Sequence, residues 1–209
     1  MAGMRKIEQR KRNRQTRKRN PFVIIGCEGK NKTEKIYFKN FHSKKCIVKF
    51  ANGNSTDPKG IVQDIINYVE SEIDVDENDK IYAVFDTDVS KNKQSQIEEA
   101  KKLANKHGVE IITSTPSFEL WFLLHFEYTT KLFVSNKELQ SYLKNYIEGY
   151  AKNNNTYLDI STFTKEALKN SKRLEKYHCD KGQALDNVDC NPYTSVYKVV
   201  DELIKRNEK

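Results

Sequence analysis

The sequence predicts an α/β fold, in which a parallel β-sheet of about four strands is flanked by helices and followed by a helical extension. Short runs rich in β-branched and aromatic residues, typical of buried parallel strands, alternate with amphipathic segments up to residue 113. The resulting order β-α-β-α-β-α-β predicts right-handed crossovers with helices on the faces of the sheet. Two of the runs end at carboxylates, one at Glu28 and one at Asp86-Thr87-Asp88. Ligand sites of open α/β sheets lie at such strand ends.

The elements of the core can be placed from local patterns. Strands are expected at 22–27, 46–50, 81–86 and 109–113, and helices at 34–41, 61–73 and 94–106. Thr33 can cap the first of these helices, and Gly108 ends the third. The segment 118–126 is almost wholly apolar and is expected to form a buried helix, with Glu119 as its one internal carboxylate.

The chain changes character after residue 127. Three more helices are expected at 135–147, 162–178 and 192–206, and Pro192 is expected to open the last one. We therefore predict three parts. They are a mobile basic arm over 1–20, an α/β core over 21–130 and a helical extension over 131–209 that packs on the core.

The positive charge of the chain is concentrated in the arm. Residues 1–19 contain nine Lys or Arg and one acid, which equals the whole net charge of +8, and the remainder balances 28 basic against 28 acidic residues. Such an arm is suited to phosphate backbones. The alternative is a solvated terminus that aids solubility. The residues expected to contact nucleic acid are Arg10, Lys11, Arg12, Arg14, Arg17, Lys18 and Arg19.

Composition also excludes several classes of protein. No run of 18 apolar residues is present, so no membrane span is expected, and the basic N-terminus lacks the apolar region of a signal peptide. The four cysteines are irregularly spaced and are interpreted as thiols of a reducing, cytoplasmic protein. The sequence contains no P-loop, so ATP hydrolysis by this chain alone is not expected.

The carboxylates after the strands are the main candidates for catalysis. If the first and third strands are neighbours, Glu28, Asp86 and Asp88 meet at one edge, where like charges need a proton or a cation. A hard divalent ion, Mg²⁺ or Mn²⁺, would satisfy them. Glu119 is expected at the same edge as a second metal ligand or general base. The alternatives are turn-forming aspartates, a helix-capping Glu28, and a buried Glu119 bonded to free amides of the helix start.

Five further residues are secondary candidates. Glu34 lies in the first turn of a helix, where a solvated acid is the simpler interpretation, and His125 is more simply a hydrogen-bonded core histidine. Three lysines in polar loops could meet phosphate or stabilise transition-state charge, although loop lysines are usually solvated. They are Lys30, Lys32 and Lys152.

Several segments resemble known families. The run 23–29 and the run 84–88 look like the TOPRIM pattern of topoisomerases, bacterial primases and OLD-family nucleases. Three longer segments are more distinctive, namely 27–38 with its C-E-G and T-E-x-x-Y-F, 117–126 with S-F-E-L-W-F-L-L-H-F, and 191–197 with N-P-Y-T-S-V-Y. They resemble the RloB family, which is associated with restriction loci and abortive phage defence. The resemblance implies a TOPRIM-like core with Glu28, Asp86 and Asp88 as metal ligands or acid–base groups.

Two functions follow as hypotheses. The first is a Mg²⁺- or Mn²⁺-dependent nuclease that acts on DNA or RNA, tRNA included, as an effector in phage defence. The second is a partner-activated or non-catalytic nucleic-acid-binding subunit that works with a separate ATPase of the ABC or AAA type. The oligomeric state is left open.

Overall fold

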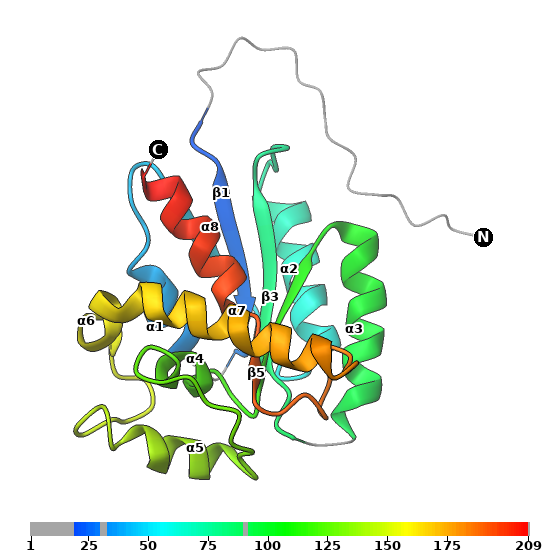
Figure 1. Ribbon diagram of the computed structural model, residues 1–209. Helices are drawn as coiled ribbons and strands as arrows, with labels where there is room; N and C mark the ends of the chain where they lie inside the picture. The colour runs from blue at the N-terminus through cyan, green and yellow to red at the C-terminus, as the bar shows by residue number, and fades with distance from the viewer. Residues whose placement is uncertain (1–18, 30–32, 90–91, 209) are drawn as a thin grey trace.

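The computed structural model describes residues 19–29, 33–89 and 92–208. It contains one five-stranded sheet in the order β2-β1-β3-β4-β5. The elements in chain order are β1 (Phe22–Cys27), α1 (Thr33–Lys39), β2 (Ile47–Phe50), α2 (Pro58–Glu72), β3 (Lys80–Asp86), α3 (Lys93–His107), β4 (Glu110–Thr115), α4 (Glu119–Leu123), α5 (Asn136–Leu143), α6 (Tyr157–Ile160), η1 (Ser161–Phe163), α7 (Thr164–Asp180), β5 (Tyr193–Thr194) and α8 (Val196–Glu208). The predicted α/β fold is confirmed, with one strand more than expected (Figure 1).

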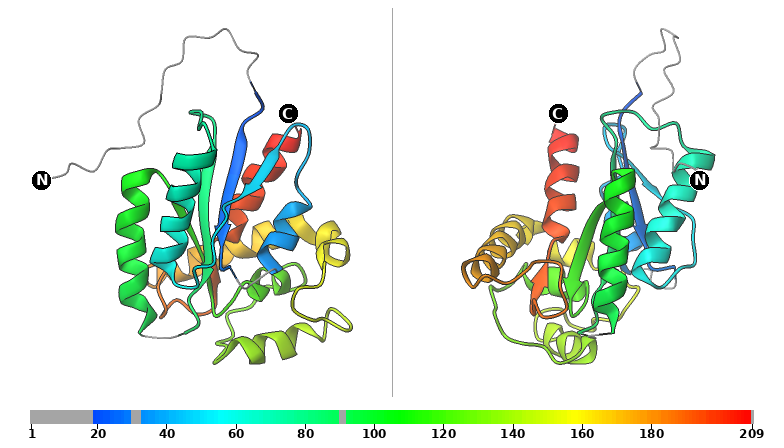
Figure 2. Two further views of the ribbon diagram at one scale, coloured as in Figure 1. Left: turned by 180° about the vertical axis from the view of Figure 1, so that it is seen from behind. Right: turned by 90° about the vertical axis from the view of Figure 1, so that its right-hand side faces the viewer.

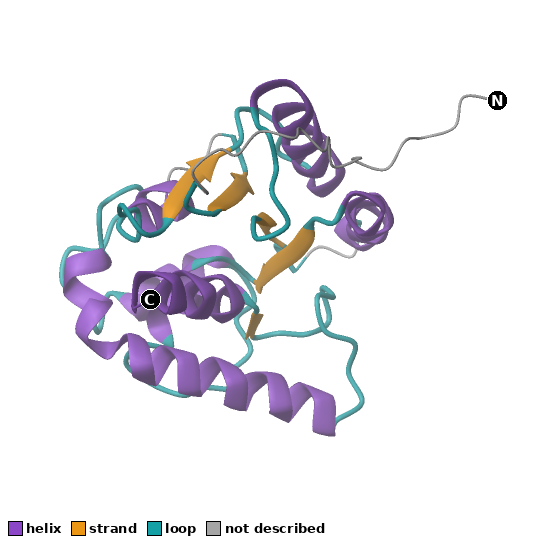
Figure 3. Ribbon diagram, turned by 90° about the horizontal axis from the view of Figure 1, so that it is seen from above, coloured by secondary structure: helices purple, strands orange, loops and turns teal. Residues whose placement is uncertain are grey.

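Four strands of the sheet are parallel and both of its faces are covered. Alternate residues of β1 point to opposite faces, so Val23 and Ile25 join one apolar cluster and Ile24 joins the other. Helices α2 and α3 cover the second face, while α1, α4 and α8 contribute to the first (Figure 3). This double burial explains why the strands are continuous apolar runs rather than alternating ones.

One glycine sets how closely a helix approaches the sheet. A side-chain carbon on Gly26 of β1 would overlap the side chain of Ile65 in α2. The absence of a Cβ therefore allows α2 to lie directly against the strand. The ends of the neighbouring helices follow the expected chemistry, since Asp57 caps α2 through Gly60 N at 2.8 Å and Gly108 ends α3 with φ of 68°.

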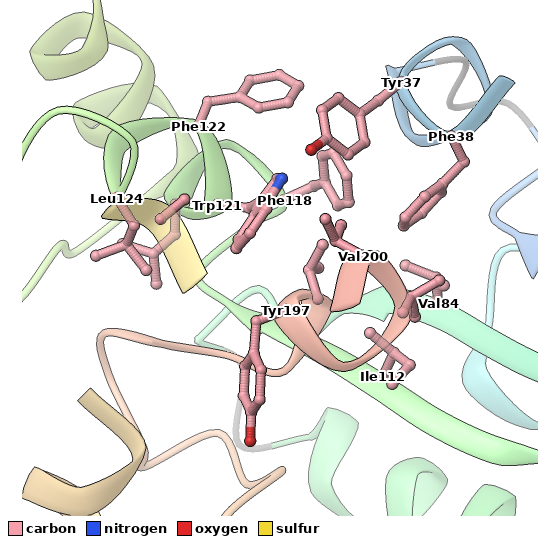
Figure 4. Close-up of a cluster of buried hydrophobic side chains, with 14 of the residues drawn as sticks. Tyr37, Phe38, Val84, Ile112, Phe118, Trp121, Phe122, Leu124, Tyr197 and Val200 are labelled. Atoms are coloured by element: carbon pink, nitrogen blue, oxygen red, sulfur yellow. The ribbon is translucent and has the colours of Figure 1, made fainter. Parts of the chain in front are cut away.

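An aromatic cluster fixes α1 and α4 at the carboxyl ends of the strands (Figure 4). The ring of Tyr37 lies edge-on to Phe118 at 5.7 Å, and Phe118 lies edge-on to Phe122 at 5.3 Å. Trp121 is fully buried beside them. Edge-to-face pairs of this kind add about 0.5–1.5 kcal/mol each to the burial of the rings. The apolar run at 118–126 thus anchors the segment that carries Glu119.

The last strand was not predicted, and it corrects the expected role of Pro192. The residues after Pro192 form β5, which pairs antiparallel with β4 through Ser114↔Thr194 and Thr115↔Tyr193. The last helix begins only at Val196. Proline favours the first turn of a helix, but here the long-range pairing with β4 decides the conformation.

Three other helices differ from the expected ranges. Helix α4 has five residues, because the bonds from His125 N to Phe122 O and from Phe126 N to Leu123 O span three residues rather than four. Helix α5 ends at Leu143 instead of residue 147. The helix expected at 162–178 is α7, shifted by two residues to Thr164–Asp180, and the short turns α6 and η1 precede it. None of the described helices is long and apolar enough to cross a membrane.

The helical extension is part of the same body as the sheet. Helix α8 lies along one face, and α7 crosses in front of it in Figure 1 and is seen from two other sides in Figure 2. Leu139 and Leu143 of α5 are buried in the same apolar cluster as Val84 of β3. Helix α5 itself lies beyond the carboxyl ends of the strands, which places it beside the candidate site (Figure 1).

Candidate active site

The sheet order brings the predicted acidic residues to one edge. Strands β1 and β3 pair in parallel from Val23↔Lys80 to Cys27↔Val84, as the sequence prediction required, and β3 pairs with β4 in the same direction. Glu28 follows β1, Asp86 ends β3, and Glu119 opens α4 just after β4. These three carboxylates therefore come from three adjacent strand ends.

Asp86 is the carboxylate whose pKa the neighbouring acidic residues raise. Its side chain is buried, and its pKa is raised well above the ordinary value, first by burial and then by four other carboxylates. Those four are Glu34, Glu119, Glu28 and Asp88. Their mutual effect shows that the five groups form one electrostatic cluster, which we call the acidic cluster.

Glu34 is a full member of the acidic cluster. The sequence left open a solvated acid at this position, but the residue is only 2% exposed. Burial is the main cause that raises its pKa to about 7, and Glu119 and Glu28 raise it further. The first turn of α1 is therefore directed into the site because Tyr37 and Phe38, one turn later, pack into the aromatic cluster.

Glu119 is held by side chains, not by the free amides that the sequence left open as an alternative. Ser117 Oγ donates to Glu119 Oε2 at 2.7 Å, and Gln140 Nε2 and Tyr150 OH donate to Oε1 at 3.0 and 3.1 Å. The Nζ atom of Lys152 lies 3.7 Å from the same Oε1 atom. Because the residue is 1% exposed, these donors replace the water that an ionised carboxylate would need.

Glu28 and Asp88 share a lysine that the sequence analysis did not single out. Lys93 Nζ lies 2.6 Å from Asp88 Oδ2 and 3.6 Å from Glu28 Oε1. Asn136 Nδ2 of α5 also donates to Asp88 Oδ1 at 2.8 Å. Burial would raise the pKa of Asp88, but the hydrogen bonds from Lys93 and Asn136 outweigh it and lower that pKa. Burial raises the pKa of Glu28, and Lys93 only partly opposes this.

Two backbone features shape this edge of the sheet. Asp88 lies outside the strand, because β3 ends at Asp86 and the backbone of Asp88 is left-handed with φ of 55°. Gly29 is packed against a neighbouring loop. A Cβ there would lie 2.5 Å from Asn54 Cα, so the glycine admits the 53–55 loop, and its amide donates to Ser55 O at 3.0 Å.

The secondary candidates divide into two groups. Lys152 contacts the acidic cluster through Glu119. His125 lies in the core, where its Nδ1 atom is 2.9 Å from Trp121 O and its ring stands edge-on to the Trp121 ring. Burial lowers the pKa of His125 to about 4, so this histidine is a neutral core residue at physiological pH. Lys30 and Lys32 lie outside the described residues.

The one described residue of the predicted nucleic-acid contacts lies far from the acidic cluster along the sheet. Arg19 precedes β1, at the amino end of the strand, and its guanidinium pairs with Asp79 at 2.5 and 2.9 Å. It also lies 3.8 Å from the centre of the Phe22 ring. Arg19 thus anchors the start of β1. The other six, Arg10, Lys11, Arg12, Arg14, Arg17 and Lys18, lie outside the described residues.

Five residues that the sequence analysis did not name complete the site. They are Lys93, Ser117, Asn136, Gln140 and Tyr150. The spacing S-x-E could have indicated Ser117, because a short polar side chain two residues before a carboxylate can reach it. The others come from segments distant in sequence, and no local pattern marks them.

The donor set has the chemistry of a site for a hard divalent cation, because every member is a carboxylate. Among the described residues, no group of three or more His, Cys, Asp or Glu side chains is arranged to hold a metal ion. The three side chains of the sequence prediction are therefore not gathered around one point. Lys93 lies between two of them and supplies the positive charge that the sequence prediction assigned to a metal.

A comparison with known protein families identifies the family of the chain. Residues 23–203 match the family model described as RloB-like protein. The chain belongs to the RloB-like family. No curated protein and no solved structure matches it. All five residues of the acidic cluster of this RloB-like protein lie within the matched stretch, whereas the basic arm lies outside it.

Proposed function

We propose that this RloB-like protein is a nuclease that depends on Mg²⁺ or Mn²⁺ and acts in the cytoplasm as an effector of phage defence. The observation that carries the proposal is the acidic cluster at the carboxyl edge of a parallel sheet. Three of its five carboxylates, Glu34, Asp86 and Glu119, are buried, and neighbouring carboxylates raise the pKa values of Asp86 and Glu34, so the arrangement costs stability. Such strained clusters are typical of catalytic sites.

Asp86, Asp88 and Glu28 would hold the first cation after Lys93 has left the space between Glu28 and Asp88, and Glu119 and Glu34 would complete the site. A bound Mg²⁺ or Mn²⁺ would polarise the scissile phosphate and lower the pKa of an attacking water. Glu28 is half-buried, and burial raises its pKa, which suits a group that takes part in proton transfer. Lys152, 3.7 Å from Glu119, can place a positive charge beside a phosphate.

A cleavage assay tests this function. The full-length protein is incubated with single-stranded DNA, double-stranded DNA and tRNA, with Mg²⁺ or Mn²⁺ and with EDTA. Wild type is expected to cut at least one substrate only with a divalent ion, and a Glu28→Gln/Asp86→Asn variant is expected to be inactive. Equal behaviour of wild type and this variant on every substrate contradicts the proposal. Circular dichroism of both proteins shows whether the variant is folded.

A second function is favoured by the exposed apolar residues of the helical extension. Leu158 is 76% exposed and Phe163 is 46% exposed. They could contact a separate ATPase of the ABC or AAA type, in which case the protein is active, or binds nucleic acid, only with that partner. Activity that appears only after addition of an ATPase of this type would favour this function over a nuclease that works alone.

A further inference from the structure

A polar cavity of about 480 Å³ lies between α5 and the 150–152 loop. We call it the α5 groove. Its charged and polar lining consists of Lys137, Gln140, Ser141, Lys144, Tyr150 and Lys152. We propose that the α5 groove binds the phosphodiester backbone of a nucleic-acid strand and leads it to the acidic cluster. The inference rests on the proposed function and names a binding surface for the same site.

The charge of the groove has one sign. Three of its lining residues are lysines, and none is an acid. No ion pair joins Lys137 or Lys144 to a carboxylate among the described residues, whereas Lys131, near the start of the same helix, is paired with Glu138 at 3.3 Å. The two lysines are therefore available to an anion from outside.

The placement of these lysines follows from the helix. Lys137, Ser141 and Lys144 are four and three residues apart, so they share one face of α5. The other face carries Leu139 and Leu143, which are fully buried in the core. Lysines on an exposed face are usually only solvated, but here they line a cavity that already has the size of a site for a nucleotide-sized group.

The groove and the acidic cluster share a wall. Three of the lining residues, Gln140, Tyr150 and Lys152, contact Glu119. A strand whose backbone lies in the groove would therefore pass beside that carboxylate. The body of the protein is neutral outside the first 19 residues, and the acidic cluster repels a polyanion. The lysines of the α5 groove would attract a polyanion and offset this repulsion.

A polynucleotide fits this surface better than a single phosphate does, because three cations lie along the groove rather than around one point. An acidic peptide offers carboxylates at similar intervals, and it is the outcome that the test must separate. Each phosphate that a lysine neutralises releases counterions, so nucleic-acid binding has a salt dependence that reports the number of contacts.

The test measures binding without cleavage. Full-length protein is titrated in EDTA into fluorescein-labelled 20-nucleotide strands of DNA and of RNA, and anisotropy is read at several salt concentrations. The variant is Lys137→Gln/Lys144→Gln. The matched control is Lys169→Gln/Lys176→Gln, which removes the same charge from exposed lysines of α7.

We expect the groove variant to lose about tenfold in affinity at low salt and its salt slope to fall by roughly 1.4–1.8, the value for two phosphate contacts. The control is expected to change less than about twofold. Unlabelled polyglutamate and inorganic phosphate should compete poorly for wild type. If the double variant is poorly folded, the single variant Lys144→Gln replaces it. It is expected to show about half the change in salt slope.

Three results would contradict the proposal that the α5 groove binds a nucleic-acid strand. They are an equal loss of affinity in the groove and control variants, displacement by polyglutamate as effective as by unlabelled strand, or no binding of either strand by wild type. Failure of the nuclease proposal looks different. In that case wild type binds, the groove variant binds weakly and the control binds normally, but no divalent ion produces cleavage.

Discussion

The two halves of the acidic cluster are built differently. Glu119 is buried and receives hydrogen bonds from three neutral side chains, which belong to the loop before α4, to α5 and to the 150–152 loop. The pair of Glu28 and Asp88 is partly open to solvent, and a single flexible ammonium group, that of Lys93, lies between them. Glu119 is held in place by packed neutral side chains. The charges of Glu28 and Asp88 are balanced by the ammonium group of Lys93, which is not fixed in this way.

The two halves are therefore stabilised by different kinds of groups. Three neutral donors reduce the cost of burying Glu119, and the charge of Lys152 lies farther away, 3.7 Å from its Oε1 atom. Lys93 neutralises the open half and can move aside, because Asp88 is half exposed and the lysine stem can rotate.

The largest effect is expected from removing the charge at the centre of the cluster. Asp86→Asn should reduce cleavage by about 1,000-fold, since the loss of a metal-binding carboxylate removes several kcal/mol of transition-state stabilisation. The free energy of unfolding should not fall, because the amide removes a buried like charge. Urea unfolding and the cleavage rate are measured, with the exposed Asp159→Asn as the control. A large loss of both stability and activity would mean that Asp86 is structural.

The next effect concerns pH and Glu34, which is buried as Glu119 is. Burial and neighbouring acids raise the pKa of Glu34 to about 7, above the value near 4.5 expected in the unfolded chain. Its contribution to stability is therefore fully present below pH 4.5 and is lost as pH rises through about 7, which amounts to at most about 3 kcal/mol. Glu34→Gln should flatten this part of the stability profile, measured by urea unfolding between pH 4.5 and 8. An unchanged slope would show that Glu34 does not titrate in this range.

A smaller effect separates the buried donor from an exposed one. Tyr150→Phe removes a hydrogen bond to the buried Glu119 and should lower the free energy of unfolding by about 1.5–3 kcal/mol. Tyr146→Phe removes a hydrogen bond to Glu127 at the surface and should cost less than about 0.5 kcal/mol. If the two variants lose the same free energy of unfolding, the hydrogen bond to the buried Glu119 is no more important for stability than one at the surface.

The smallest effect tests whether Lys93 competes with a cation. Lys93→Met leaves Glu28 and Asp88 without their ammonium partner, so the affinity for Mn²⁺ should rise by roughly two- to fivefold, the range of a partly exposed ion pair. The binding is followed by the electron paramagnetic resonance signal of free Mn²⁺. Lys101→Met, which breaks a pair with Glu98 on α3, should leave the affinity unchanged. A weaker affinity in Lys93→Met would show that the lysine supports the cation site instead.

Much of the scaffold could be predicted locally, and the failures share one cause. The parallel strands and the first three helices follow from the periodicity of apolar residues, whereas the sequence left open whether β1 and β3 are neighbours, and only the sheet order places them side by side. Strand β5 has only two residues and forms because β4 offers it an open edge. The interpretation of Glu34 as a solvated acid is wrong for a similar reason, because its burial depends on the packing of α1 against α4.

Which carboxylates lie at the edge of the sheet follows from the order of residues along the chain, because residues that follow parallel strands must lie at the carboxyl ends of those strands. Glu28, Asp86 and Glu119 are of this kind. How their charges are balanced depends on tertiary packing. Lys93, Gln140 and Tyr150 reach the acidic cluster from α3, α5 and the loop after α5. Their contacts depend on how distant segments pack, and a one-dimensional pattern of residues does not contain that information.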